Sequence, residues 1–136
     1  MRMYPKLVST CVKAYLFSMR EIACLFAALA DPTRLRLLHL ISGGEICVCF
    51  LQGVLQTNQP KISRHLAYLR KAGLVTARRD GKWIHYQLKK QDKDLQPILT
   101  EILARLENLP QSRKDLTRLK EIRCCPARYG FSSPIS

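Results

Sequence analysis

Apolar residues recur at helical spacing along most of the chain. The first run predicts a helix that ends near Ala30, with an apolar face at Ile22, Leu25, Phe26 and Leu29. Asp31 then supplies an N-cap and Pro32 the first position of a second helix, which ends at Ser42 before two glycines. We treat residues 1–18 as an N-terminal extension, with Met19 as an alternative start of the chain.

The next two predicted helices are joined by a tight turn. A short helix is expected from about Cys47 to Gln56, and Asn58 can cap a longer one from about Gln59 to Ala72. The apolar face of the longer helix consists of Ile62, Leu66 and Leu69. Its opposite face is basic, so the pair is predicted to form a helix-turn-helix whose second helix can lie in a major groove.

A hairpin is predicted after this helix. The sequence Asp80-Gly81 separates two β-prone runs, 74–79 and 82–88, and Asp-Gly in this position is a strong hairpin signal. The basic residues at its tip are Arg78, Arg79 and Lys82. We expect them to form a cationic wing that suits phosphates or a minor groove.

The C-terminal part carries a wide apolar stripe. The stripe consists of Leu95, Ile98, Leu99, Ile102, Leu103, Leu106 and Leu109. It predicts a long helix from Asp92 that breaks at Pro110 and resumes from Ser112 to Ile122. A small winged domain does not need so wide a face, which favours a dimer interface shared with the first helix. Folding of the last helix onto its own core is the alternative.

The fold class predicted from these elements is mainly α with a β-hairpin wing, a winged helix-turn-helix that dimerises through its first and last helices. We expect three segments: the extension 1–18, the DNA-binding and dimerisation domain 19–123, and a flexible cysteine-containing tail 124–136.

Charge points to a polyanionic partner. The 136 residues contain 23 Lys and Arg against 10 Asp and Glu, which gives a formal net charge of +13. Solubility alone is the plainer explanation of such a charge. The sequence has no apolar run of the ~18 residues that span a membrane, and Lys13 interrupts the one candidate for a signal-peptide core. We therefore expect a cytoplasmic protein with no membrane partner.

Six cysteines favour metal or redox chemistry over a disulfide framework in such a protein. They are Cys11, Cys24, Cys47, Cys49, Cys124 and Cys125. Soft thiolates select As(III), Sb(III), Cd(II) or Pb(II) over hard cations. Cys47 and Cys49 are expected in the first turn of a helix, where the helix N-terminus favours the thiolate. Residues two apart on a helix point in nearly opposite directions, so one ion can bind both only if that turn unwinds or is strained.

Four motifs between Leu25 and Leu88, about half of the chain, stand in a fixed order. They are Leu29-Ala30-Asp31-Pro32-Thr33-Arg34-Leu35, Glu45-Ile46-Cys47-Val48-Cys49, Gln59-Pro60-Lys61-Ile62-Ser63-Arg64-His65-Leu66 and Gly81-Lys82-Trp83-Ile84-His85-Tyr86. In this order and spacing they resemble the ArsR family of metalloregulatory repressors, and its arsenic-sensing branch in particular. The resemblance implies a homodimeric repressor that binds double-stranded operator DNA without any cofactor and leaves it when As(III) or Sb(III) binds.

The sequence departs from the arsenic-sensing pattern at one ligand. That pattern often has a third cysteine where this chain has Gln52. Arsenite prefers three thiolates, so we expect the third from Cys124 or Cys125, with Cys11 of the partner chain as an alternative. If no third thiol takes part, the inducer is an organoarsenical that needs only two. Cadmium- or lead-sensing by the same fold remains open, as does a repressor switched by thiol oxidation.

The expected DNA contacts lie on the second helix of the helix-turn-helix and on the wing. They are Gln59, Lys61, Ser63, Arg64, His65, Tyr68, Lys71, Arg78, Arg79 and Lys82.

The remaining candidate groups are assigned structural roles. His39 is expected on a helix surface, His85 on a strand of the wing and Cys24 in the core. A zinc sensor is disfavoured because the last long helix has no histidine. An enzyme is disfavoured because no histidine neighbours Cys47 or Cys49 in the sequence as a base.

Overall fold

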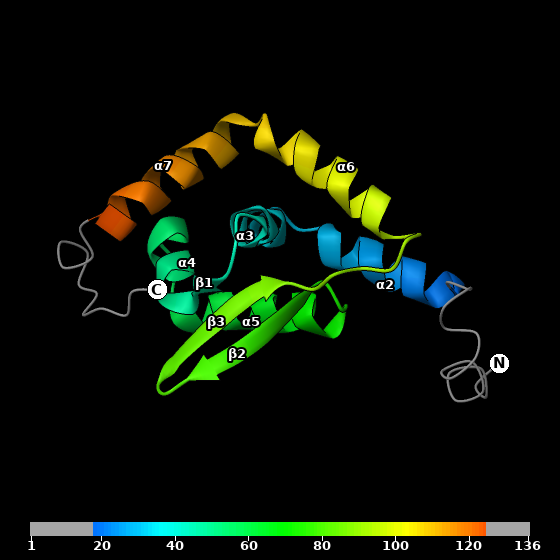
Figure 1. Ribbon diagram of the computed structural model, residues 1–136, viewed down its shortest axis with the longest axis horizontal. Coiled ribbons are helices and arrows are strands. Elements are labelled where there is room, and N and C mark those ends of the chain that lie inside the picture. Colours follow the sequence, from blue (N-terminus) through cyan, green and yellow to red (C-terminus); the bar gives the residue numbers. More distant parts are fainter. Residues whose placement is uncertain (1–17, 125–136) are drawn as a thin grey trace.

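The computed structural model describes residues 18–124. The elements in this range are α2 (Met19–Leu29), α3 (Pro32–Ser42), β1 (Ile46–Cys47), α4 (Val48–Leu55), α5 (Gln59–Lys71), β2 (Val75–Asp80), β3 (Trp83–Leu88), α6 (Gln96–Glu107) and α7 (Pro110–Cys124). Helix α5 and the hairpin of β2 and β3 lie on one side of α3, and α6 and α7 arch over its other side (Figure 1).

The helices start where the capping residues predict. The Asp31 carboxylate accepts a hydrogen bond from the backbone N–H of Arg34 at 3.1 Å, and Pro32 follows at the first helical position. The Asn58 side chain accepts from the backbone N–H of Lys61 at 2.9 Å at the start of α5. Local capping therefore determines where α3 and the second helix of the predicted helix-turn-helix begin.

The sheet has one strand more than the sequence predicts. Strands β2 and β3 pair in antiparallel fashion across the predicted turn, where Gly81 has a φ of 62°. The two-residue strand β1 adds to the free side of β3, which gives the order β1-β3-β2. In this pairing Ile46 lies opposite Tyr86 and Cys47 opposite His85. The segment that carries Cys47 is thus part of the wing sheet.

The core joins the helix-turn-helix to the sheet. The predicted inward residues of α5 are buried, as is Leu51 of α4. Helix α3 crosses the centre and buries Leu37, Leu38, Leu40 and Ile41 against its neighbours. This confirms the predicted fold, mainly helical with a hairpin wing.

The two C-terminal helices differ in part from the prediction. Helix α6 begins at Gln96 instead of near Asp92, and α7 begins at Pro110 because proline is tolerated in a first helical turn. Helix α7 packs on α4 and α3, where Leu119 and Ile122 are buried. The last helix therefore covers the core of its own chain, which is the alternative considered above for its apolar face.

An apolar surface remains on α2 and α6. Met19, Ile22 and Phe26 of α2 and Ile98 of α6 are exposed, while Leu25 and Leu29 face the core. None of the helices within residues 18–124 is long and apolar enough to cross a membrane.

Two expectations for single residues are wrong. Cys24 is exposed and does not pack in the core. His39 is buried instead of lying on a helix surface, and its Nδ1 has no hydrogen-bond partner among the described residues. Helix α3 lies between several elements, so positions that periodicity assigns to its outer face are covered as well.

Candidate metalloid site and nucleic-acid interface

The two central cysteines lie side by side at the junction of β1 and α4. Cys47 is the last residue of β1 and the N-cap of α4, with an extended backbone (φ −72°, ψ 142°), whereas Cys49 lies in the first helical turn. The Cys49 thiol donates a hydrogen bond to Cys47 Sγ, with the sulfurs 3.1 Å apart. The expectation that the turn must unwind or be strained to bring them together is wrong, because Cys47 is not helical.

Cys49 keeps its proton at neutral pH. Burial raises the pKa of the Cys49 thiol to about 12, and the hydrogen bond to Cys47 and the charge that Cys47 can carry act in the same direction. Cys47 itself is 2% exposed. We expected the helix N-terminus to favour the thiolate of Cys49, but the cost of burying a charge outweighs that effect.

The sulfur pair fits a soft ion. For metal–sulfur bonds of about 2.3 Å that meet at roughly a right angle, two sulfurs lie about 3.3 Å apart. The observed separation of 3.1 Å is close to this value. Sulfur donors exclude hard cations such as Mg²⁺ and Ca²⁺. The pair can therefore hold two corners of a pyramidal site.

A third protein ligand is not assembled in the described range. No group of three or more His, Cys, Asp or Glu residues suited to a metal occurs within residues 18–124. Cys124 is exposed at the end of α7, and the structure does not bring it to Cys47 and Cys49. The other two candidates, Cys125 and Cys11, lie outside the described residues.

An ion pair connects the cysteine segment to the wing. Glu45 directly precedes β1, and its two carboxylate oxygens accept hydrogen bonds from Arg78 of β2 at 2.7 and 3.1 Å. The hydrogen bond from Arg78 lowers the pKa of the Glu45 carboxyl. With the pairing of β1 and β3, this contact makes the thiol site continuous with the predicted DNA-binding hairpin.

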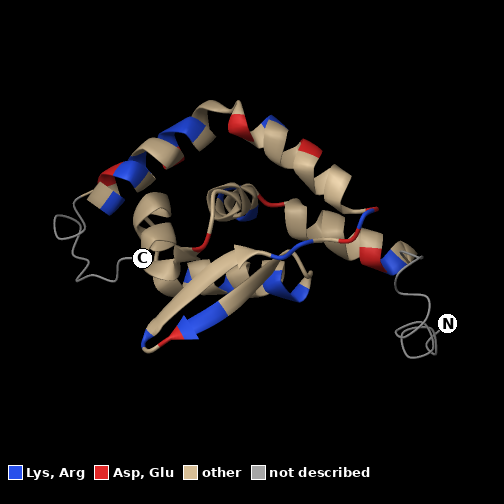
Figure 2. Ribbon diagram, viewed as in Figure 1, with Lys and Arg blue, Asp and Glu red and all other residues tan. Residues whose placement is uncertain are grey.

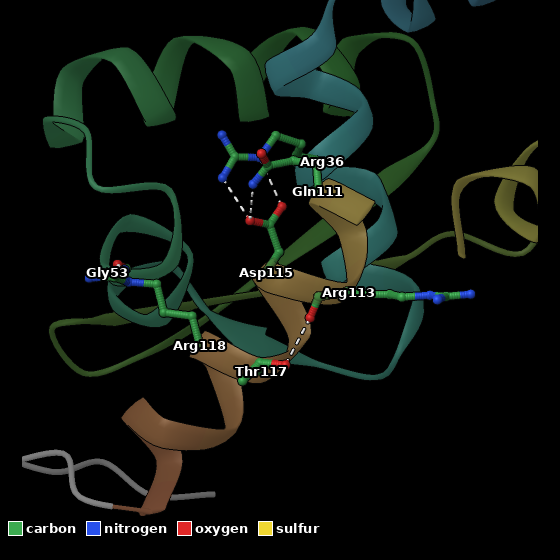
Figure 3. A network of polar contacts seen from close by, with 7 residues as sticks. All are labelled: Arg36, Gly53, Gln111, Arg113, Asp115, Thr117 and Arg118. Carbon is green, nitrogen blue, oxygen red and sulfur yellow. Dashed lines mark hydrogen bonds and ion pairs between the residues drawn. The ribbon is translucent and has the colours of Figure 1, made fainter. Parts of the chain in front are cut away.

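Helix α7 is bound to α3 and to α4, the helix that carries Cys49. Asp115 is buried and forms a bidentate ion pair with Arg36 of α3, with N···O distances of 2.7 and 2.8 Å (Figure 3). The Asp115 hydrogen bond raises the pKa of Arg36. The Arg118 side chain donates to the carbonyl oxygen of Gly53 in α4 at 3.3 Å. Helix α4 is thus fixed by α7 at its C-terminal half and by the sheet at its N-terminus.

Most of the predicted DNA contacts form an open basic surface. Basic residues follow α5 and β2, and a separate group lies along α7 (Figure 2). The exposed candidates on α5 and the wing are Gln59, Lys61, Ser63, Arg64, Lys71, Arg79 and Lys82. Their side chains are free of the core and can reach a duplex.

Three predicted DNA contacts have partners from distant parts of the sequence, and a fourth, Lys82, lies over the ring of the adjacent Trp83 at 5.1 Å. The guanidinium of Arg34 lies 3.4 Å from Nδ1 of His65 and 4.2 Å from the centre of the Tyr68 ring. Arg78 is held by Glu45. Sequence reasoning missed these contacts because Arg34 and Glu45 lie about 30 residues before their partners.

Comparison with known proteins decides the family. The model for "Bacterial regulatory protein, arsR family" matches residues 31–77. The arsenical resistance operon repressor of Staphylococcus aureus is 35% identical over 97 residues, which cover 71% of this chain and 88% of that protein. The chain belongs to the ArsR family. The arsenical resistance operon repressor of Escherichia coli K12 is 57% identical over 65 residues, 47% of this chain and 56% of that protein.

The alignments with these relatives cover only part of their length. The chain spans only a little over half the length of the E. coli repressor and of the arsenic resistance regulator ArsR1 of Pseudomonas putida, 56% and 58%. Both relatives are named as regulators of arsenical or arsenic resistance.

Solved structures agree on the fold. The homodimeric winged helix-turn-helix domain Mb0332 from Mycobacterium bovis has a TM-score of 0.56 at 27% identity, with 68% of this chain and 87% of that chain covered. The antimony-specific repressor AntR has a TM-score of 0.53 at 29% identity, with 71% and 84% covered. The ArsR-family chain therefore has a winged helix-turn-helix fold.

Proposed function

We propose that this ArsR-family protein is a cytoplasmic repressor that binds operator DNA as a homodimer and is released when As(III) or Sb(III) binds Cys47 and Cys49. The observation that carries the proposal is the 3.1 Å separation of these two sulfurs at the junction of the wing sheet and α4. A soft ion bound there contacts the helix-turn-helix and the wing at once. Repressors of arsenical resistance among the relatives support this choice of inducer, and AntR supports antimony.

The dimer is proposed from the exposed apolar side chains of α2. Ile22 and Phe26 face solvent in the single chain, and a second copy would cover them. The M. bovis structure of the same fold is homodimeric. A two-fold dimer presents two copies of α5, which suits a palindromic operator.

Release follows from the two connections of the thiol site. An ion that binds both sulfurs replaces the hydrogen bond between Cys49 and Cys47, and its volume displaces the backbone of the buried junction between β1 and α4. Through β3 and the Glu45–Arg78 pair this change reaches the wing, and through α4 it reaches the turn before α5. A ligand that prefers a different arrangement of these elements lowers the population that fits DNA, and a coupling of ~1–3 kcal/mol reduces operator affinity roughly 5- to 150-fold.

The third ligand is assigned to the C-terminal pair. Two thiols complete a monosubstituted organoarsenical, whereas arsenite has a third position to fill. We propose that Cys124 or Cys125 fills it by movement of the end of α7. Replacement of both by serine should weaken the response to arsenite and leave the response to phenylarsine oxide unchanged. Equal responses to both arsenicals would instead direct attention to Cys11.

The thiol-switched alternative uses a disulfide of Cys47 and Cys49 or of the C-terminal pair, Cys124 and Cys125. The sulfurs of Cys47 and Cys49 are close enough to form a disulfide once peroxide has oxidised one of them to a sulfenic acid. That oxidation begins with attack of a thiolate on peroxide, and the raised pKa of Cys49 keeps that thiol protonated. Under anaerobic conditions, release by arsenite without peroxide favours ion sensing. Release by peroxide alone favours the redox switch.

Fluorescence anisotropy with a labelled duplex tests the proposal. The duplex is first selected by the wild-type protein from a randomised library. Cys47→Ser and Cys49→Ser should each bind it with wild-type affinity and lose release by arsenite, because a hydroxyl is a poor ligand for soft ions. The matched control is Cys24→Ser, which alters an exposed thiol outside the site. Arsenite release by a protein that lacks both Cys47 and Cys49 would overturn the assignment.

A further inference from the structure

Arg34 of α3 contacts both α2 and α5. No other described side chain of α3 forms hydrogen bonds to these two helices. The Arg34 Nε donates to the carbonyl oxygen of Ala28 at 2.7 Å, and one terminal nitrogen donates to that of Ala27 at 3.0 Å. These carbonyls lie in the last turn of α2, where C=O groups lack the N–H partners of a continuing helix. The carbonyl oxygen of Ala27 also accepts from the backbone N–H of Ala30 at 3.3 Å. The guanidinium therefore caps the C-terminus of α2 and complements its negative end.

The same guanidinium holds the outer face of α5. Its other terminal nitrogen lies 3.4 Å from His65 Nδ1, and its central carbon lies 4.2 Å from the centre of the Tyr68 ring. The His65 side chain is only 16% exposed, with Asp31 3.9 Å away. The Tyr68 residue is 45% exposed. Arg34 thus contacts a half-buried and an exposed residue of the helix that is expected to read DNA.

The chemistry of the contact is specific to arginine. A planar guanidinium can donate to two carbonyls along one edge and cover an aromatic ring with its face. A lysine ammonium is a point charge and cannot hold all of these partners in one position. Asp31, which accepts from the backbone N–H of Arg34, sets the start of α3 from which the side chain extends.

We propose that Arg34 is a positioning residue for operator recognition, which holds the reading helix α5 at a fixed orientation to the dimer-face helix α2. This inference rests on the proposed function, because it needs a dimer that binds DNA. In a two-fold dimer, the separation of the two copies of α5 is set through α2. One base pair between half-sites changes their distance by about 3.4 Å and their angle by about 36°. A rigid link between α2 and α5 therefore makes the protein selective for one half-site spacing.

The test compares Arg34→Lys with the wild type on the duplex selected by the wild-type protein and on versions with one base pair added or removed between the half-sites. We expect Arg34→Lys to bind the selected duplex about tenfold more weakly, the lower end of the effect of one charge-assisted hydrogen bond. Its preference for the selected spacing over the altered spacings should fall as well. The matched control is Arg113→Lys, whose exposed side chain on α7 points away from Asp115 (Figure 3).

The ratio between spacings separates positioning from stability. A residue that only stabilises the fold would lower the thermal midpoint and weaken all three duplexes by the same factor. Arg34→Gln, which keeps one amide donor and no charge, provides a second variant if circular dichroism shows that the lysine variant is unfolded. Wild-type spacing preference in a folded Arg34 variant would overturn the inference. Failure of the wild-type protein to bind any duplex as a dimer would overturn the proposed function instead.

Discussion

The strongest prediction concerns the effect of pH on two kinds of inducer. Cd(II) arrives as a cation and displaces whatever protons the thiols carry. Arsenite at neutral pH is arsenous acid, As(OH)₃, and each thiol that binds it releases one hydroxide as water. Binding of arsenite to two thiols therefore consumes two more protons than binding of cadmium to the same thiols. This difference does not depend on how many protons the thiols carry before binding.

The structure supplies the magnitude. Cys47 and Cys49 are the two thiols, 3.1 Å apart. Burial raises the pKa of Cys49 to about 12, so that thiol keeps its proton throughout the neutral range. Each proton displaced changes an apparent dissociation constant tenfold per pH unit, so cadmium should bind at least about tenfold more tightly per unit of rising pH. The ratio of cadmium affinity to arsenite affinity should therefore rise about 100-fold per pH unit, because the two binding reactions differ by two protons.

Competition titrations at several pH values between about 6.5 and 7.5 check this difference, with ion affinity measured in the wild-type protein and in Cys49→Ser. The serine variant should lose one tenfold step of the cadmium dependence, because it lacks the proton of Cys49. Parallel pH dependence for both ions in the wild-type protein would refute the reasoning, since arsenite would then not exchange its hydroxides for both thiols.

Three further predictions follow from single contacts. Glu45→Gln removes the charge that pairs with Arg78, so anisotropy should show tighter operator binding by the freed cation and weaker release by arsenite. The thermal midpoint should not change, because exposed ion pairs add little stability. Unchanged release by arsenite would exclude a role of the Glu45–Arg78 pair in release. Asp115→Asn leaves Arg36 without its charged partner, so the free energy of unfolding should fall by about 2–3 kcal/mol. This is below the ~3–5 kcal/mol of fully buried pairs, because Arg36 keeps some contact with water. An unchanged denaturant midpoint would show that the Arg36–Asp115 pair does not anchor α7. Phe26→Glu places a charge in the proposed dimer face but not in the core, so sedimentation should find a folded monomer, whereas a wild-type dimer of this variant would move the interface elsewhere.

The parts of the fold that local chemistry determines could be predicted from the sequence. The caps at Asp31 and Asn58 act on backbone N–H groups three residues away, and the turn at Asp80 and Gly81 joins strands that are adjacent in the sequence. Periodicity also identified the buried face of α5, because that helix has one buried side.

The details of the site depend on contacts between distant residues. Strand β1 has only two residues, too few to show alternation, and it forms because β3 offers a free edge. This strand changes the backbone at Cys47 and with it the sulfur geometry. The partners Arg36 and Asp115 are 79 residues apart, so their pairing leaves no local pattern. The prediction for His39 is wrong for the same reason, since burial on a helix that contacts several elements does not follow a single stripe. The prediction for Cys24 is wrong because this residue lies on a part of α2 that the described chain leaves uncovered.

The central claim is that Cys47 and Cys49 together sense the metalloid and release DNA. The most direct measurement uses a variant in which Cys11, Cys24, Cys124 and Cys125 are all replaced by serine, so that these two thiols alone remain. Phenylarsine oxide, which is completed by two thiols, is added to this variant bound to labelled operator, and anisotropy is followed. The account predicts full release at one equivalent per subunit. An operator complex that survives excess phenylarsine oxide, while the wild-type complex dissociates, would contradict it.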